Sequence, residues 1–173
     1  SIILLGSICL ICAGIFVYGS LVSASNSIDK NLNQIMADLD EKVKNNAAEV
    51  MSSNPYDYTI GNEYYQNIVD MGIKALPDII NKINSSTENG LKEYLLAIAA
   101  EEIASVKLKR DSFNWSNAKE FYQEWNVFLR NIPVQVSYII NDTETTLEQK
   151  QEGLKELGIM ALPYIQEEIQ SGH

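Results

Sequence analysis

Two related stretches decide the fold of this chain. Residues 69–85 read VDMGIKALPDIINKINS, and residues 155–171 read KELGIMALPYIQEEIQS. Eight of the 17 aligned positions are identical, and the offset between the two copies is a constant 86 residues. Identity in register over a run of this length indicates an internal repeat.

Each copy contains the signals of two helices joined by a tight turn. Gly72 and Gly158 can adopt the left-handed conformation that ends a helix, which other residues resist. An Ala-Leu-Pro sequence follows, and proline is tolerated in the first turn of a helix because its missing N–H has no partner there. The second helix then has an apolar stripe, which consists of Leu76, Ile79, Ile80 and Ile83 in one copy and of Leu162, Ile165 and Ile169 in the other.

The sequence between the copies predicts another helical pair, without the repeated turn. Residues 90–108 form a helical pattern whose four alanines permit close approach of a second helix. A helix over residues 118–131 follows, and Asn117 with Glu120 is expected to cap its start. We expect Pro133 to kink or break this helix before a short continuation.

A second capping signal lies just before the second copy. Thr145-Thr-Leu-Glu148 has the spacing of a capping box, in which a threonine and a glutamate satisfy each other's free backbone N–H groups. We expect it to open the first helix of that copy.

The helix–Gly–turn–Ala-Leu-Pro–helix pattern resembles the HEAT repeat and its HEAT-like relatives. The offset of 86 residues equals two repeats of 43, which lies within the range of about 40 to 47 for such repeats. The resemblance implies an all-α fold, a short HEAT-like α-solenoid of about three helical pairs over residues 55–173. The chain is also similar to uncharacterised secreted or membrane-anchored HEAT-like proteins of Gram-positive bacteria, which implies a localisation but no activity.

Residues 25–54 predict one long amphipathic helix before this domain. Its apolar stripe consists of Ile28, Leu32, Ile35, Leu39, Val43 and Val50. Ser27 is the expected N-cap, and Asn54 should end the helix because a residue before proline disfavours helical geometry. The helix could pack on the domain as a lid, or form a juxtamembrane stalk or coiled coil.

Residues 1–24 form an apolar targeting segment. The run from Ile2 to Val22 has no charge, and as a helix of about 30 Å it would cross a bilayer core. It is either a signal peptide, cleaved after Val22-Ser-Ala24, or an uncleaved transmembrane anchor. Both alternatives place the remaining chain outside the cytoplasm, secreted or anchored to the membrane through residues 1–24.

The composition argues against several classes of function. The formal net charge is −10, all of it after residue 28, so the domain should repel nucleic acid. The two cysteines, Cys9 and Cys12, lie in the apolar segment, and His173 is the one histidine. We therefore expect no metal site, no cofactor and no catalytic site of the Ser–His or Cys–His type.

Two weaker catalytic patterns have structural explanations. Ser116-Asn-Ala-Lys119 has the Ser-x-x-Lys spacing of penicillin-binding enzymes, but no Lys-Thr-Gly strand accompanies it, so a hydrolase remains a remote alternative. Glu101 and Glu102 interrupt an apolar helix, where adjacent side chains point about 100° apart and cannot share a site. We expect one of them to face inward and to make a structural polar contact.

Aromatic residues are the remaining candidates for a binding site. Tyr65, Phe121 and Trp125 are expected in the core, whereas the candidate surface positions are Tyr56, Tyr58, Trp115 and Tyr122. The predicted function is a non-catalytic, extracytoplasmic helical-repeat module that binds a protein or peptide partner. The alternative is an envelope sensory or accessory domain that recognises cell-wall glycan through exposed aromatics.

Overall fold

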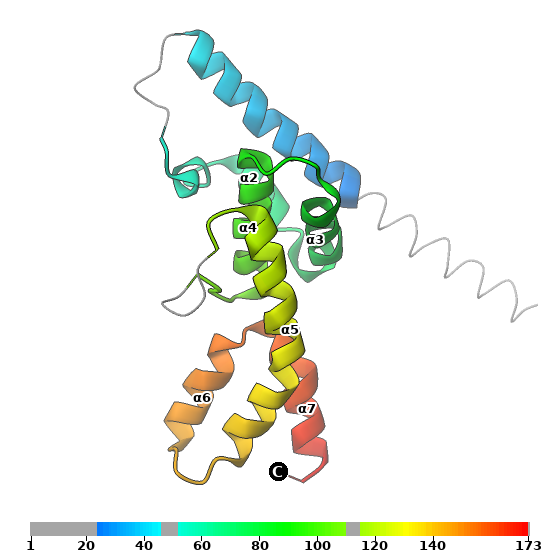
Figure 1. Ribbon diagram of the computed structural model, residues 1–173, viewed down its shortest axis with the longest axis vertical. Coiled ribbons are helices and arrows are strands. Elements are labelled where there is room, and N and C mark those ends of the chain that lie inside the picture. The colour runs from blue at the N-terminus through cyan, green and yellow to red at the C-terminus, as the bar shows by residue number, and fades with distance from the viewer. Residues whose placement is uncertain (1–23, 46–51, 110–114, 173) are drawn as a thin grey trace, which may run out of the picture.

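The structure is a computed structural model that describes residues 24–45, 52–109 and 115–172 (Figure 1). Throughout these ranges the regular elements are helices and no strand occurs, so the predicted all-α class is confirmed. The apolar segment of residues 1–24 lies almost wholly outside the described residues, and so do Val50 and Arg110. None of the described helices is both long and apolar enough to span a bilayer.

The first described helix covers residues 24–44, and the remaining elements follow in chain order. They are η2 (Pro55–Tyr58), α2 (Glu63–Val69), η3 (Gly72–Ala75), α3 (Leu76–Ser85), α4 (Leu91–Ala104), α5 (Ala118–Asn141), α6 (Leu147–Glu156), η4 (Ile159–Ala161) and α7 (Leu162–Gln170). In Figure 1 the 24–44 helix lies at one end of the long axis, α6 and α7 lie at the other, and α5 runs from beside α4 in the middle towards α6 and α7.

The two copies of the repeat fold alike around their glycines. Gly72 and Gly158 have φ angles of +64° and +62°, so the predicted positive φ is confirmed at both. At Gly158 the ψ angle is −163°, an extended mirror-image conformation rather than the expected left-handed helical one. In each copy a 3-10 turn then leads into α3 or α7, whose first turn contains the predicted proline.

The long N-terminal helix is shorter than predicted. Helical geometry ends at residue 44, and residues 52–54 are not helical, so the expectation of one helix up to Asn54 is wrong. Asn54 instead begins η2, because its side-chain oxygen accepts a hydrogen bond from the Tyr56 backbone N–H. The inner stripe is confirmed in part: Ile28, Leu32 and Ile35 are buried, whereas Val43 is 49% exposed.

The helix predicted over residues 90–108 ends four residues early, at Ala104. Ser105 adopts the left-handed conformation (φ 56°, ψ 43°), and its N–H closes the last turn on the carbonyls of Glu101 and Glu102. The chain then turns back, because the Glu101 carboxylate accepts hydrogen bonds from the N–H groups of Leu108 and Lys109.

Pro133 lies inside helix α5, which continues to Asn141, so of the two predicted alternatives, a kink or a break, the break is wrong. A proline there removes one backbone hydrogen bond, and neighbouring burial on α5 compensates: Ile132 and Val136, on either side of it, are fully buried. The capping box of α6 is real but shifted by one residue. Thr146 and Gln149 form it, in place of Thr145 and Glu148.

Two clusters of buried side chains hold the helices together. The larger one joins the 24–44 helix to α2, α3, α4 and the first half of α5. The smaller one joins the second half of α5 to α6, η4 and α7 through Ile132, Val136, Leu157 and Ala161. The N-terminal helix is therefore part of the domain core, as the lid interpretation expects.

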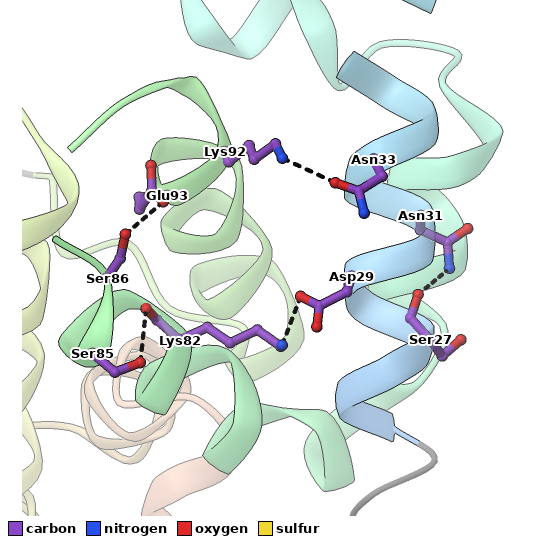
Figure 2. Close-up of polar contacts among 9 residues, drawn as sticks. All are labelled: Ser27, Asp29, Asn31, Asn33, Lys82, Ser85, Ser86, Lys92 and Glu93. Atoms are coloured by element: carbon purple, nitrogen blue, oxygen red, sulfur yellow. Dashed lines mark hydrogen bonds and ion pairs between the residues drawn. The ribbon is translucent and has the colours of Figure 1, made fainter. Parts of the chain in front are cut away.

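Polar contacts fix the 24–44 helix on the domain (Figure 2). Lys82 of α3 forms an ion pair with Asp29 at 2.6 Å, and Lys92 of α4 donates to Asn33 at 2.9 Å. These pairs flank the apolar stripe and orient the helix across the ends of α3 and α4.

Candidate binding surface

Six aromatic rings form a continuous chain through the larger core. Tyr56, Tyr94, Trp115, Phe121, Trp125 and Phe128 contact one another in this order, with ring centroids 4.7 to 6.4 Å apart. Trp115 is fully buried, so its predicted surface position is wrong. It is buried because its ring packs between Tyr94 and Phe121 while its indole N–H donates to Glu101 at 3.1 Å. The predicted core positions of Tyr65, Phe121 and Trp125 are confirmed.

The other three candidate aromatics are half-buried. The ring of Tyr56 meets that of Tyr94 edge-on, and the amino group of Lys109 lies 5.8 Å from the Tyr56 ring centroid. Burial, followed by the negative charge of Glu101, raises the pKa of Tyr56 to about 12. Tyr58 donates to the carbonyl of Ser52, and Tyr122 packs against the core. All three rings thus contribute to internal packing.

Both side chains of the Ser-x-x-Lys pattern make hydrogen bonds that stabilise helix ends. Ser116 donates its hydroxyl to the Glu120 carboxylate at 2.6 Å, next to the N-cap Asn117. Lys119 donates to three backbone carbonyls at the end of α3, those of Ile83, Asn84 and Ser86, at 2.6 to 3.1 Å. The two side chains therefore have separate partners, as expected for a helix start and for a cation at a helix C-terminus.

We expect Lys119→Met to lower the free energy of unfolding by about 2 kcal/mol, because three carbonyls lose a charged donor. Lys150→Met is the matched control, since Lys150 donates to a single carbonyl, that of Ile140 at the end of α5. Its expected cost is about 1 kcal/mol. Urea unfolding followed by circular dichroism measures both values, and equal costs would contradict the capping role of Lys119.

The two copies of the repeat differ most in the exposure of their apolar stripes. In the first copy Leu76, Ile79 and Ile83 are 4%, 0% and 0% exposed. Their equivalents 86 residues later are Leu162, which is 60% exposed, Ile165, which is half-buried, and Ile169, which is 63% exposed. The side chains that are core in the first copy are thus partly or largely exposed at the same register in the second.

These exposed residues border a shallow, mainly apolar groove with a volume of about 510 Å³. We call it the α6–α7 groove; its lining residues are Ser105, Gln151, Leu154, Lys155, Gly158, Ile159, Leu162 and Ile165. A groove with apolar walls and few polar groups is typical of a binding site for a ligand or a protein segment.

The sequence did not predict this exposed surface, because an apolar stripe does not reveal whether another helix covers it. The stripes of α3 and α7 look equivalent in the sequence, and both predict a buried face. One signal was present: position 65 in the first copy is tyrosine, whereas position 151 in the second is glutamine. A polar residue at a core position of a repeat indicates a different environment.

Over the described part of the chain, no group of three or more His, Cys, Asp or Glu side chains is placed to hold a metal ion. Neither the protein-family models, nor the curated proteins, nor the solved structures that were compared with this chain include a match.

Proposed function

We propose that this chain is a short HEAT-like α-solenoid of about three helical pairs that binds a protein or peptide partner without catalysing a reaction. The observation that carries the proposal is the α6–α7 groove, together with the exposed side chains of Leu162 and Ile169 beside it. A continuous exposed apolar surface of this kind is typical of an interface.

The proposed location is outside the cytoplasm, either secreted or anchored through residues 1–24. Support comes from the uncharged run of residues 2–22 and from the absence of cysteine after Cys12. Of the four aromatic candidates for the glycan-binding alternative, Trp115 is fully buried and donates a hydrogen bond to Glu101.

Photocrosslinking in cells that make the protein tests this proposal. A photoreactive amino acid at position 162 should give a discrete adduct with another protein, whereas the same group at Gln66 should not. Gln66 is the matched control because it is exposed on α2 of the first copy, away from the groove. Absence of an adduct at position 162, or equal labelling from both positions, would contradict a binding role for this surface.

A further inference from the structure

In the first copy of the repeat, helix α4 occupies the surface that is open in the second. Of the described elements, α3 and α4 make the most extensive contact, and α4 also packs on α2. Five side chains of α2 and α3 are buried in the core cluster that contains α4; they are Tyr65, Ile68, Leu76, Ile79 and Ile83. Tyr65 also donates its hydroxyl to Glu102 of α4 at 2.8 Å.

The register equivalents of these five residues surround the α6–α7 groove. They are Gln151, Leu154, Leu162, Ile165 and Ile169, each 86 residues later. Four of them line the groove, and Ile169 is exposed one turn beyond Ile165 on α7. The groove is therefore the empty counterpart of the surface that α4 covers.

We propose that the α6–α7 groove binds an amphipathic helix of a partner protein, in the position that α4 takes on α2 and α3. This inference rests on the proposed function and names the kind of partner. Gln151, at the position of Tyr65, would offer its side-chain amide to a polar group of that helix.

The other end of the domain already uses this mode of packing. The 24–44 helix buries Ile28, Leu32 and Ile35 in the core, and Asp29 and Asn33 beside that stripe meet lysines of α3 and α4 (Figure 2). The 24–44 helix thus shows that an amphipathic helix, with apolar residues on one face and polar residues beside them, can cover an apolar surface of this domain.

The chemistry of the groove specifies its occupant further. The sequence from 142 to 171 contains seven acidic residues and two lysines. None of these acidic residues lines the groove itself, whose one charged lining residue is Lys155, 3.5 Å from the carboxylate of Glu152. The net negative charge of the segment around the groove attracts a helix with basic flanks, and it repels a second copy of the same acidic unit. Four alanines of α4 are buried where it packs on its neighbours (Ala97, Ala99, Ala100 and Ala104), so the apolar face of the partner helix should contain small residues that allow a close approach.

Three synthetic peptides of equal length test the inference on the full chain. The first places leucine and alanine at helical spacing (i, i+3, i+4, i+7) with lysine elsewhere. The second replaces each lysine with glutamate, and the third contains the residues of the first in an order without helical periodicity. We expect the first peptide to bind about tenfold more tightly than the others by fluorescence anisotropy, and to gain helix on binding by circular dichroism. Its affinity should fall as salt rises.

Two surface variants locate the binding site. Leu162→Lys should weaken binding of the basic peptide about tenfold, because it removes an apolar contact and adds a like charge. Val134→Lys adds the same charge on α5, at a residue that is 71% exposed and does not line the groove. The affinity of this variant for the basic peptide should therefore be unchanged. Both replaced side chains are exposed, so both variants should remain folded.

Two results would overturn the inference. The first is equal binding of the basic, acidic and reordered peptides. The second is a dimer of the full chain, detected by sedimentation and lost in Leu162→Lys, which would make a second copy the occupant. If an adduct forms from position 162 in cells but the peptides bind alike, the inference fails and the proposed function stands. If the basic peptide binds selectively and no adduct forms in cells, the proposed function fails instead.

Discussion

Gly158→Ala should lower the free energy of unfolding by about 4 kcal/mol or more, the largest effect that we expect from any single methyl group in this chain. A Cβ atom at Gly158 would lie 2.2 Å from the carbonyl oxygen of Ala104 and 2.9 Å from that of Ser105. Both oxygens belong to the backbone at the end of α4, so they cannot rotate away as a side chain could. The φ of +62° with a ψ of −163° adds strain, because only glycine occupies that region readily.

Gly72→Ala is the matched control, since Gly72 occupies the same position in the first copy. Its φ is +64°, but a Cβ atom there would meet no heavy atom within 4 Å. The expected cost is therefore the conformational one alone, about 1 kcal/mol. Urea unfolding followed by circular dichroism gives both values. If the two substitutions cost the same, then α6 and η4 do not approach the end of α4 as closely as the structure shows.

The contrast between these glycines shows how far the sequence predicts the fold. Glycine and proline are local signals, because their backbone preferences do not depend on distant residues; this is why the turns at Gly72 and Gly158 and the starts of α3 and α7 were predicted correctly. Gly158 and Ala104 are far apart in the sequence, so no local sequence pattern could predict their close approach.

The wrong predictions have the same origin. Pro133 lowers the local helix preference, but burial of Ile132 and Val136 keeps α5 continuous. Trp115 stands in a segment with loop composition, and its burial depends on Tyr94 and Glu101 of another element. The surface of α7 could not be predicted either, because its stripe matches that of α3, and only the position of α4 distinguishes a covered face from an open one.

The carboxylate of Glu101 holds the segment that follows α4. The sequence predicted only that one of the two glutamates, Glu101 or Glu102, would face inward. One of its oxygens, Oε1, accepts hydrogen bonds from Leu108 N at 2.7 Å, from Lys109 N at 3.3 Å and from Trp115 Nε1 at 3.1 Å. Glu102, the next residue, is exposed, and its carboxylate accepts a hydrogen bond from the Tyr65 hydroxyl at 2.8 Å. The inward position of Glu101 and its structural contact are confirmed.

We expect Glu101→Ala to lower the free energy of unfolding by about 3 kcal/mol, because it leaves donors without a partner, including the buried indole N–H of Trp115. Glu102→Ala, which removes a single contact from an exposed side chain, should cost about 1 kcal/mol or less. Urea unfolding followed by tryptophan fluorescence measures both. Equal costs would show that Glu101 does not hold the segment after α4.

Glu101→Gln separates the charge of this residue from its hydrogen bonds. The amide keeps an acceptor oxygen for the same donors, so most of the stability should remain. The pKa of Tyr56 should fall from about 12, because burial still raises it but the negative charge of Glu101 no longer does. An unfolded tyrosine titrates near 10, so the folded state holds the Tyr56 proton more tightly, and this contribution to stability is present below pH 10 and is lost as the pH rises towards 12.

Ultraviolet titration of the tyrosines measures this shift, and Tyr56→Phe assigns it. Most of the difference between Glu101→Gln and the unsubstituted chain should disappear when both also contain Tyr56→Phe, because the main titrating group is then absent. A difference that persists undiminished in the Tyr56→Phe background would assign the shift to another tyrosine. Tyr65 is the one to examine in that case, since the carboxylate of Glu101 also contributes to the raised pKa of Tyr65, after burial and Glu102. Agreement with the first outcome would show that a single buried carboxylate both holds the end of α4 and contributes to the raised pKa of Tyr56.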